Sequence, residues 1–343
     1  MAICQVTNRL NEGLEYVCVN RMNQVFALAM SVAACASVEA AAQRQEDATK
    51  KLMLRPAGQA AGAPELQLLP KPQELTDADA FPLYVKAVTS VPKDLDWGKI
   101  KGWRQMPVSQ LPKDDVASVL RQFDASVPLL EQAGKCKRCD WPLSVEGDPP
   151  IDLNTIRNLT FLLALKARSQ LAGGDYTSCT RTLGTGLALA KHLSAGPTAI
   201  HLLVGVAVSA VIYGEIEQYV QQQGAPSLEA AIRTIPKPLF DEQHSDLFGM
   251  DAAGRARVQL LLGRANRHVI ALQYIETLRL YATKTGKWPQ TLDEIKASLP
   301  NDPVAGKPFS YKRLSDTGAI LEGPLPAGGD VKDTVQYELT VGK

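Results

Sequence analysis

The fold is decided by residues 151–222, which read IDLNTIRNLTFLLALKARSQLAGGDYTSCTRTLGTGLALAKHLSAGPTAIHLLVGVAVSAVIYGEIEQYVQQ. Apolar residues recur along this stretch at the three- and four-residue spacing of an α-helix. Two groups of turn-forming residues interrupt it, AGGDY at 172–176 and SAGP at 194–197. The stretch therefore predicts three consecutive helices. Small residues on their faces predict close helix contacts: Ala188, Ala190, Gly205, Ala207 and Ala210.

Helical patterns continue on both sides of this stretch. Residues 79–90 and residues 111–134 read as helices, and Pro128 is expected to kink the second of them. A long apolar seam predicts another helix over residues 252–283. After residue 308 the period changes to the alternation of a small antiparallel sheet. We therefore predict a mainly α fold of antiparallel helical hairpins, with a small α+β module at the carboxyl end.

The chain is long enough for more than one compact part, since it has 343 residues. Residues rich in Gln, Ala, Pro and Gly precede the first helix, a composition that buries too little apolar surface to fold. The predicted organisation is a targeting segment at 1–42, a disordered linker at 43–75, an N-terminal helical region at 76–150, a helical bundle at 151–284 and the α+β module at 285–343.

The amino terminus has the features of an export signal. Translation from either Met1 or Met22 is compatible with the sequence, and Val25–Ala34 is an apolar run of signal-peptide length. The residues before Cys35 resemble a lipobox, which would place a lipid on that cysteine. Small residues at 38–42 offer ordinary cleavage sites instead. An uncleaved cytosolic leader is the third interpretation. We expect export to the periplasm or lipid anchoring to the envelope.

The composition of the chain limits which classes of binding partner we expect. Hydrophobic residues make up 45% of the chain and charged residues 21%, which is ordinary for a globular protein. The net charge is +1, so there is no basic excess that would favour nucleic acid. The sequence shows no apolar run of the length that we would assign to a transmembrane span. No cofactor-binding motif such as a Gly-rich phosphate loop is present in the sequence. The expected partner is therefore a protein of the envelope.

Two motifs resemble known families. The GGDY turn at 173–176 resembles the turn between the two helices of a tetratricopeptide repeat, but no second copy follows at the repeat period. Residues 278–313 resemble the carboxyl half of the major type II secretion pseudopilins, without the prepilin cleavage signature. The matching residues are Tyr281, Gly286, Trp288, Pro289, Leu292, Asp302, Pro303, Gly306, Pro308, Phe309 and Tyr311.

Residues 81–313 as a whole resemble a family of exported bacterial helical proteins of uncharacterised activity. The resemblance runs through FPLYVKAV, CDWPL, IRNLTFLLALKAR and IPKPL, among other stretches. It implies a helical scaffold in the cell envelope, and it supplies no catalytic residues. It also implies that Asp140, Trp141, Trp288 and Pro289 act as structural anchors.

The sharpest chemical question concerns Cys136 and Cys139, which form a CxxC pair. A redox centre would place such a pair at a helix amino end after a strand, whereas this pair follows a predicted helix. A zinc site would need further ligands, and only Cys179 with His192 or His201 is a loose candidate. In an oxidising compartment the alternative is that the pair closes a small disulfide. The last interpretation is packing, with Cys139 buried, Trp141 in the core and Asp140 capping the turn.

Two further candidate features contain histidine. His192 lies near the end of a predicted helix, where a histidine more often compensates the helix dipole than binds a metal. Carboxylates surround His244 at 241–246, and such a run either binds a divalent cation or forms a solvated loop. The sequence therefore favours a non-catalytic binding or scaffold protein. The alternatives are a CxxC-dependent redox or metal-binding accessory protein and a peripheral component of a secretion system.

Overall fold

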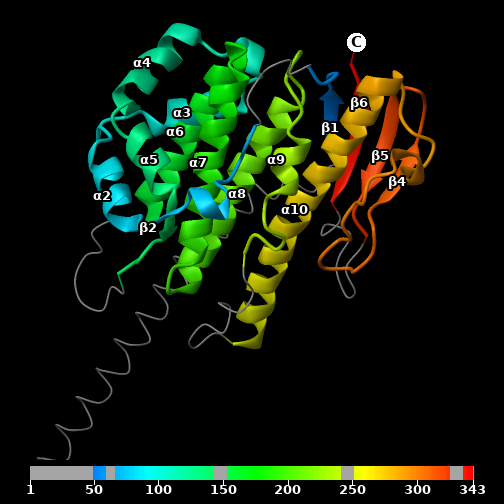
Figure 1. Ribbon diagram of the computed structural model, residues 1–343. Helices are drawn as coiled ribbons and strands as arrows, with labels where there is room; N and C mark the ends of the chain where they lie inside the picture. The colour runs from blue at the N-terminus through cyan, green and yellow to red at the C-terminus, as the bar shows by residue number, and fades with distance from the viewer. Residues whose placement is uncertain (1–48, 59–65, 143–152, 241–250, 325–334, 343) are drawn as a thin grey trace, which may run out of the picture. The chain divides into compact units, whose positions relative to one another are not determined.

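The middle of the chain is built from four long helices: α6 (Leu153–Ala172), α7 (Tyr176–Ser194), α8 (Ala199–Tyr219) and α10 (Ala252–Thr285). A computed structural model describes residues 49–58, 66–142, 153–240, 251–324 and 335–342 (Figure 1). The three helices predicted within 151–222 are confirmed, with breaks at the two predicted turns. Helices α6, α7 and α8 pack against one another, and α10 packs on α8. The protein is mainly helical with a small sheet.

Local signals explain where these helices begin. Asp175 precedes α7 and its carboxylate accepts a hydrogen bond from the backbone N–H of Ser178. Thr198 and Asp251 hold the same position before α8 and α10. The predicted helix over 252–283 is confirmed as α10, which ends directly before Gly286.

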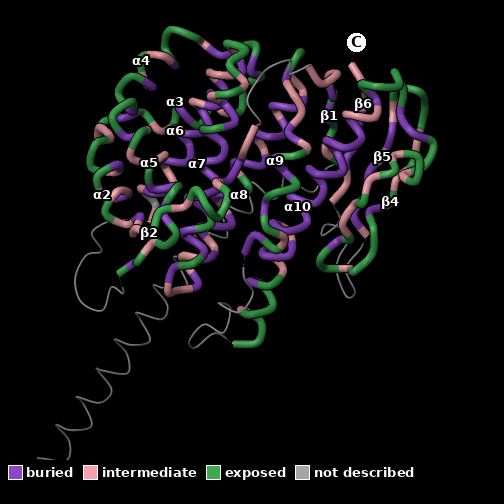
Figure 2. The backbone as a smooth tube through the Cα atoms, in the orientation of Figure 1, coloured by how far each residue is buried: buried purple, intermediate pink, exposed green. Residues whose placement is uncertain are grey.

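Helix α8 is the centre of the core. Its faces pack on α6, α7 and α10, so apolar residues are needed almost all round it (Figure 2). At Gly205 an added Cβ would come within 2.7 Å of the Ala190 carbonyl oxygen, which confirms the close helix contact predicted at this glycine. Ala210, in contrast, is exposed. By length and composition α8 is also the one described helix that is able to span a membrane, although 61% of its apolar window is buried within the protein. The expectation that the chain has no transmembrane span stays a prediction.

The N-terminal helices are short: α2 (Phe81–Thr89), α3 (Trp97–Gln105), α4 (Lys113–Phe123) and α5 (Val127–Ala133). The single kinked helix predicted over 111–134 is wrong, because the chain breaks at Asp124–Ser126 into α4 and α5. Pro128 lies in the first turn of α5, where the missing N–H of a proline costs little. Proline therefore starts a helix here instead of bending one. A further short helix, α9 (Glu229–Arg233), lies before α10.

Two sheets complete the described fold. In the larger sheet the strand order is β1-β6-β5-β4, formed by β1 (Lys50–Leu54), β4 (Ser310–Arg313), β5 (Gly318–Glu322) and β6 (Gln336–Val341). The pairs β4–β5 and β5–β6 are antiparallel, as predicted for the end of the chain. The smaller sheet pairs β2 (Thr76–Asp79) with β3 (Cys136–Arg138) in parallel.

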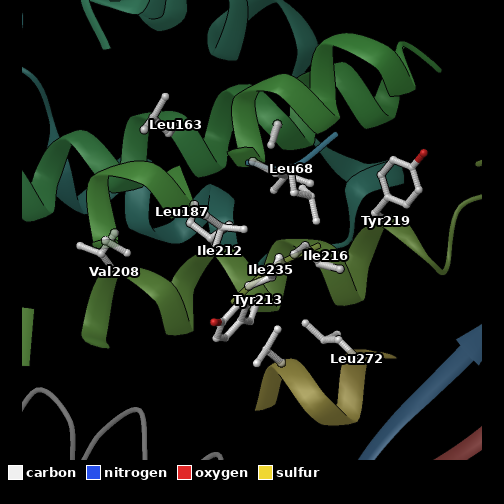
Figure 3. Packing of buried hydrophobic residues seen from close by; sticks show 14 of the residues in the cluster. Leu68, Leu163, Leu187, Val208, Ile212, Tyr213, Ile216, Tyr219, Ile235 and Leu272 are labelled. Atoms are coloured by element: carbon white, nitrogen blue, oxygen red, sulfur yellow. The ribbon is translucent and has the colours of Figure 1, made fainter. Parts of the chain in front are cut away.

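The prediction of a disordered linker over 43–75 is wrong for residues 49–58 and 66–75, which are ordered. Strand β1 pairs with β6, and Leu52 and Leu54 are buried. Leu68 and Leu69 are also buried, and Figure 3 shows Leu68 among the core side chains of the long helices. The composition of this stretch had indicated too little apolar surface to fold. Its leucines nevertheless become buried, because they pack against partners far away in the sequence.

The core joins these parts. Figure 3 shows Leu187, Ile212, Tyr213 and Leu272 packed between helices, and all four are buried. Residues 51–343 form one compact unit. The predicted targeting segment 1–42, with Cys35, lies outside the described residues.

Candidate functional site

The CxxC pair lies on and just after strand β3. Cys136 is buried and its thiol lies 3.6 Å from the carbonyl oxygen of Gln132, while Cys139 is half-buried. Both cysteines are free. Burial raises the pKa of both thiols, and the nearby carboxylate of Asp79 raises them further. Thiols of raised pKa are poor nucleophiles, because the thiolate is the reactive form.

The extended backbone of β3 also opposes a disulfide between Cys136 and Cys139. From Cys136 to Cys139 the chain advances about 10 Å if it stays extended. A disulfide needs Cα atoms about 4.4–6.8 Å apart. Closing the bond would require β3 to leave its pairing with β2, where the backbone N–H of Thr76 donates to Lys135.

The side chain of Trp141 is buried beside the CxxC pair. Its indole N–H donates to the carbonyl oxygen of His192 at 2.8 Å. The indole stacks on the ring of Tyr84 and meets the rings of Phe81 and His201 at centroid distances of 5.5 and 5.6 Å. This cluster joins α2, the segment after β3, α7 and α8.

His192 is buried in the same cluster and is hydrogen-bonded through both ring nitrogens. Its Nε2 lies 3.1 Å from the Cys136 carbonyl oxygen and its Nδ1 lies 2.8 Å from the Tyr84 hydroxyl. A carbonyl only accepts, so Nε2 carries the proton and Nδ1 accepts from the tyrosine. Burial lowers the pKa of His192 to about 4. The expected role as a charged residue that compensates the helix dipole is therefore wrong.

Asp140 does not cap the turn as predicted. Its carboxylate is exposed and pairs with Arg138 at 3.1 Å. The capping carboxylate is that of Asp79, which accepts from the backbone N–H groups of Phe81 and Asp140. Asp79 thereby ties the start of α2 to the CxxC segment.

The structure does not bring the loose metal candidate together. Cys179 and His192 both lie on α7, and thirteen residues of helix separate them by about 20 Å. Within the part of the chain that the structure describes, no three His, Cys, Asp or Glu side chains form a cluster suited to a metal ion. The acidic run 241–246 with His244 lies outside the described residues.

The pseudopilin-like motif forms a packed support for the sheet. Trp288 is buried, and Pro289 accepts a hydrogen bond from the Tyr311 hydroxyl through its carbonyl oxygen. Asp302 is fully buried and accepts from Arg267 Nε at 2.5 Å and from the backbone N–H groups of Val304 and Ala305. The aspartate of the motif therefore fixes its own turn and joins it to α10.

Three buried polar networks were missed by the sequence reasoning. Arg168 pairs with Glu215 at 2.7 Å, and Arg279 pairs with Glu276 at 3.0 Å. Glu217 accepts hydrogen bonds from His268 and from the Tyr337 hydroxyl. A signal for them existed, since two glutamates interrupt the apolar helix α8, and a buried carboxylate needs a partner.

An open groove lies between the segment before β2 and helix α7. Its volume is about 680 Å³, and it is bordered by residues 66–70, by the end of α5 and by one face of α7. Leu68 runs directly over Gly184 of α7, where an added Cβ would come within 2.1 Å of the Leu68 carbonyl oxygen. The charged side chains around the groove are Glu74, Glu131, Lys135 and Arg181.

The face of α7 that forms the floor is polar and small. Its lining residues recur at helical spacing: Thr177, Thr180, Arg181, Gly184, Thr185 and Ala188. Thr180 and Thr185 donate their hydroxyl protons to carbonyl oxygens of their own helix, at Tyr176 and Arg181. Their hydroxyl oxygens keep acceptor capacity. No family model matches this chain, and no curated protein or solved structure matches it either.

Proposed function

We propose that this protein is a non-catalytic binding or scaffold protein of the bacterial cell envelope, and that it holds a segment of a protein partner in the groove over α7. The groove carries the proposal. Its volume of about 680 Å³ falls within the range of ligand-binding clefts, roughly 300–1,000 Å³. It is also bordered by groups that bind peptides by hydrogen bonds and charge.

An extended peptide suits this groove for two reasons. Residues 66–70 already pass over the glycine of α7, so the helix face accepts polypeptide backbone at close range. The rim offers both signs of charge, through the half-buried Glu131 and the exposed Lys135 and Arg181. Amide groups and side chains of a peptide find both donors and acceptors there.

The alternatives receive less support. A redox role for Cys136 and Cys139 requires a reactive thiolate, and the raised pKa of both thiols opposes that. A peripheral role in secretion rests on the pseudopilin-like residues, whose sheet also contains β1 from the amino-terminal side. A test of that role therefore needs the full chain, because residues 285–343 alone lack this strand.

Export itself rests on residues 22–42 and is tested by the intact mass of the mature chain.

The groove is tested by placing a photo-crosslinking residue at Thr177, which is exposed on the groove floor. In cells that express the protein, we expect a defined protein adduct from this position. The same residue placed at Ser118, exposed on α4, serves as the surface control. Identical adducts from both positions would contradict a partner bound in the groove.

A glycine variant sharpens this experiment. Gly184→Ala forces the Leu68 carbonyl away from α7 and displaces the wall of the groove, at a cost of about 1–3 kcal/mol in unfolding free energy. We expect it to abolish the Thr177 adduct while the chain stays folded, as judged by circular dichroism. Gly214→Ala is the matched control, since an added Cβ on that face of α8 meets nothing within 4 Å. An adduct that survives Gly184→Ala would exclude the groove as the binding surface.

A further inference from the structure

Helix α3 packs across α6 (Figure 1). Cationic side chains of α3 lie there over one aromatic ring of α6. The ammonium group of Lys101 lies 5.6 Å from the ring centroid of Phe161, and the guanidinium carbon of Arg104 lies 4.6 Å from it. Arg157 comes four residues before Phe161 on α6, so the two share one face of that helix. Two cations of α3 thus lie over one ring of α6, and a third cation lies one turn earlier on α6.

Two of these cations are partly buried without an acceptor. The Nε atoms of Arg104 and Arg157 are shielded from solvent, and neither has a hydrogen-bond partner among the described residues. A buried donor left without an acceptor is strongly unfavourable, so native proteins rarely keep one without a reason. Two arginine donors thus lack an acceptor among the described residues, and a bound anion would supply one.

The nearest buried carboxylate does not fill this role. Glu215 is bound to Arg168 at 2.7 Å, and the same arginine also donates to the Met106 carbonyl oxygen. Burial lowers the pKa of Arg104, and the charge of Arg168 acts in the same direction, whereas Glu215 opposes it. Arg168 and Glu215 form an ion pair, and no ion pair of Lys101, Arg104 or Arg157 is found among the described residues.

We propose that Lys101, Arg104 and Arg157 form a binding site for a phosphate group over the ring of Phe161. A planar guanidinium presents donors in a fork that matches phosphate oxygens. A carboxylate would offset one of the three charges, whereas a phosphate monoester offsets up to two and provides three acceptor oxygens. The ring of Phe161 holds the two α3 cations in place by cation–π contact. This site is separate from the groove over α7.

The proposal is tested by titrating the full chain with inorganic phosphate in a phosphate- and sulfate-free buffer, by calorimetry. We expect saturable binding to the wild type and weakening by about tenfold or more in Arg104→Met and in Arg157→Gln, because each removes charge-assisted hydrogen bonds. Arg121→Gln is the matched control, since that arginine is exposed on α4. Acetate at equal ionic strength should bind much more weakly than phosphate.

Thermal unfolding separates loss of the site from loss of the fold. In phosphate-free buffer, Arg104→Met should melt at the same temperature as the wild type or higher, because it removes a buried donor without a partner. Adding phosphate should raise the melting temperature of the wild type and of Arg121→Gln, and it should leave that of Arg104→Met unchanged. If a core variant fails to fold, Lys101→Gln, at an exposed position, gives the same binding test.

A parallel arm identifies the source of the phosphate. Phosphatidylcholine vesicles that contain phosphatidic acid are tested for sedimentation with the protein and its variants. Vesicle binding that depends on Arg104 assigns the site to a lipid headgroup, and binding of inorganic phosphate alone assigns it to a soluble ligand. The proposal is overturned if neither probe binds, or if the variants bind as the wild type does.

Discussion

Arg267 and Arg104 each have a guanidinium Nε that is shielded from solvent, but the surroundings of the two side chains differ. Arg267 is 1% exposed in its side chain and donates to Asp302 and to the Pro324 carbonyl oxygen. Arg104 lies over Phe161, and its Nε has no partner among the described residues. The first arginine joins α10 to the turn before β4, whereas the second lies in an excess of positive charge. The difference separates a charge that stabilises the fold from one that is available to a ligand.

The cluster around Trp141 resembles the surroundings of Arg267, because its buried polar groups have hydrogen-bond partners. Each ring nitrogen of His192 has a partner, and the indole N–H of Trp141 donates to a carbonyl oxygen. Networks in which every buried group is paired make the fold unique and rigid. Breaking one of them should therefore lower stability, while changing the cationic site between α3 and α6 should lower ligand binding.

The largest effect is expected from Asp302→Ala. The substitution leaves the Arg267 guanidinium buried without its carboxylate and removes the acceptor for two backbone N–H groups. Loss of one partner from a buried pair costs about 3–5 kcal/mol. Denaturant unfolding measures this loss of unfolding free energy.

The matched control for Asp302 is Asp316→Ala, whose carboxylate is 76% exposed and pairs with Arg313. We expect a cost of about 1 kcal/mol or less, as for other surface ion pairs. Equal effects at Asp302 and Asp316 would remove the distinction on which the comparison rests.

A smaller effect is expected from lowering the pH. Burial lowers the pKa of His192 from its usual 6.5 to about 4, so the folded protein favours the neutral ring. Stability from this effect is complete above about pH 6.5 and is lost as the pH falls through about 4, because the unfolded chain takes up the proton first. The shift corresponds to about 3 kcal/mol in unfolding free energy.

The measurement is denaturant unfolding of the wild type and of His192→Gln between pH 7 and pH 4. We expect the variant to be less stable at neutral pH and its stability to change less over this interval. A wild type and a variant with parallel pH profiles would show that His192 is not the group that titrates.

The smallest effect is expected at the CxxC pair. In the native protein Cys136 should react slowly with an alkylating reagent, since its thiol is buried and has a raised pKa. After unfolding, both Cys136 and Cys139 should be alkylated in the mass spectrum, including in protein taken from an oxidising compartment. Recovery of the pair as an internal disulfide would instead show that β3 leaves β2 in the cell.

Much of the helical core was predictable from local patterns. The boundaries of α7, α8 and α10 follow from Asp175, from the residues at 194–198 and from Gly286, which act within a few residues of the helix ends. The burial of Trp141 and Trp288 also agrees with their expected roles as anchors. Such features depend on residues that are close together in the sequence, so they can be predicted from the sequence.

The polar site and the amino-terminal strand were not predictable in this way. Strand β1 is ordered because β6, almost 300 residues later, supplies its hydrogen bonds. No sequence pattern marks Arg104, and only the packing of α3 on α6 places it over the ring of Phe161. The CxxC pair drew attention because of its spacing, but the extended backbone of β3 decides its geometry.

The sequence by itself determined the helical class, the positions of the main helix ends and the sheet that closes the chain, because helix periodicity and capping are local. The tertiary structure decided which polar groups are paired and which are not. It also decided that residues 66–70 border a groove on α7. Burial, pKa and hydrogen bonding depend on partners far along the chain, and such partners are fixed only when the helices and the sheet pack together.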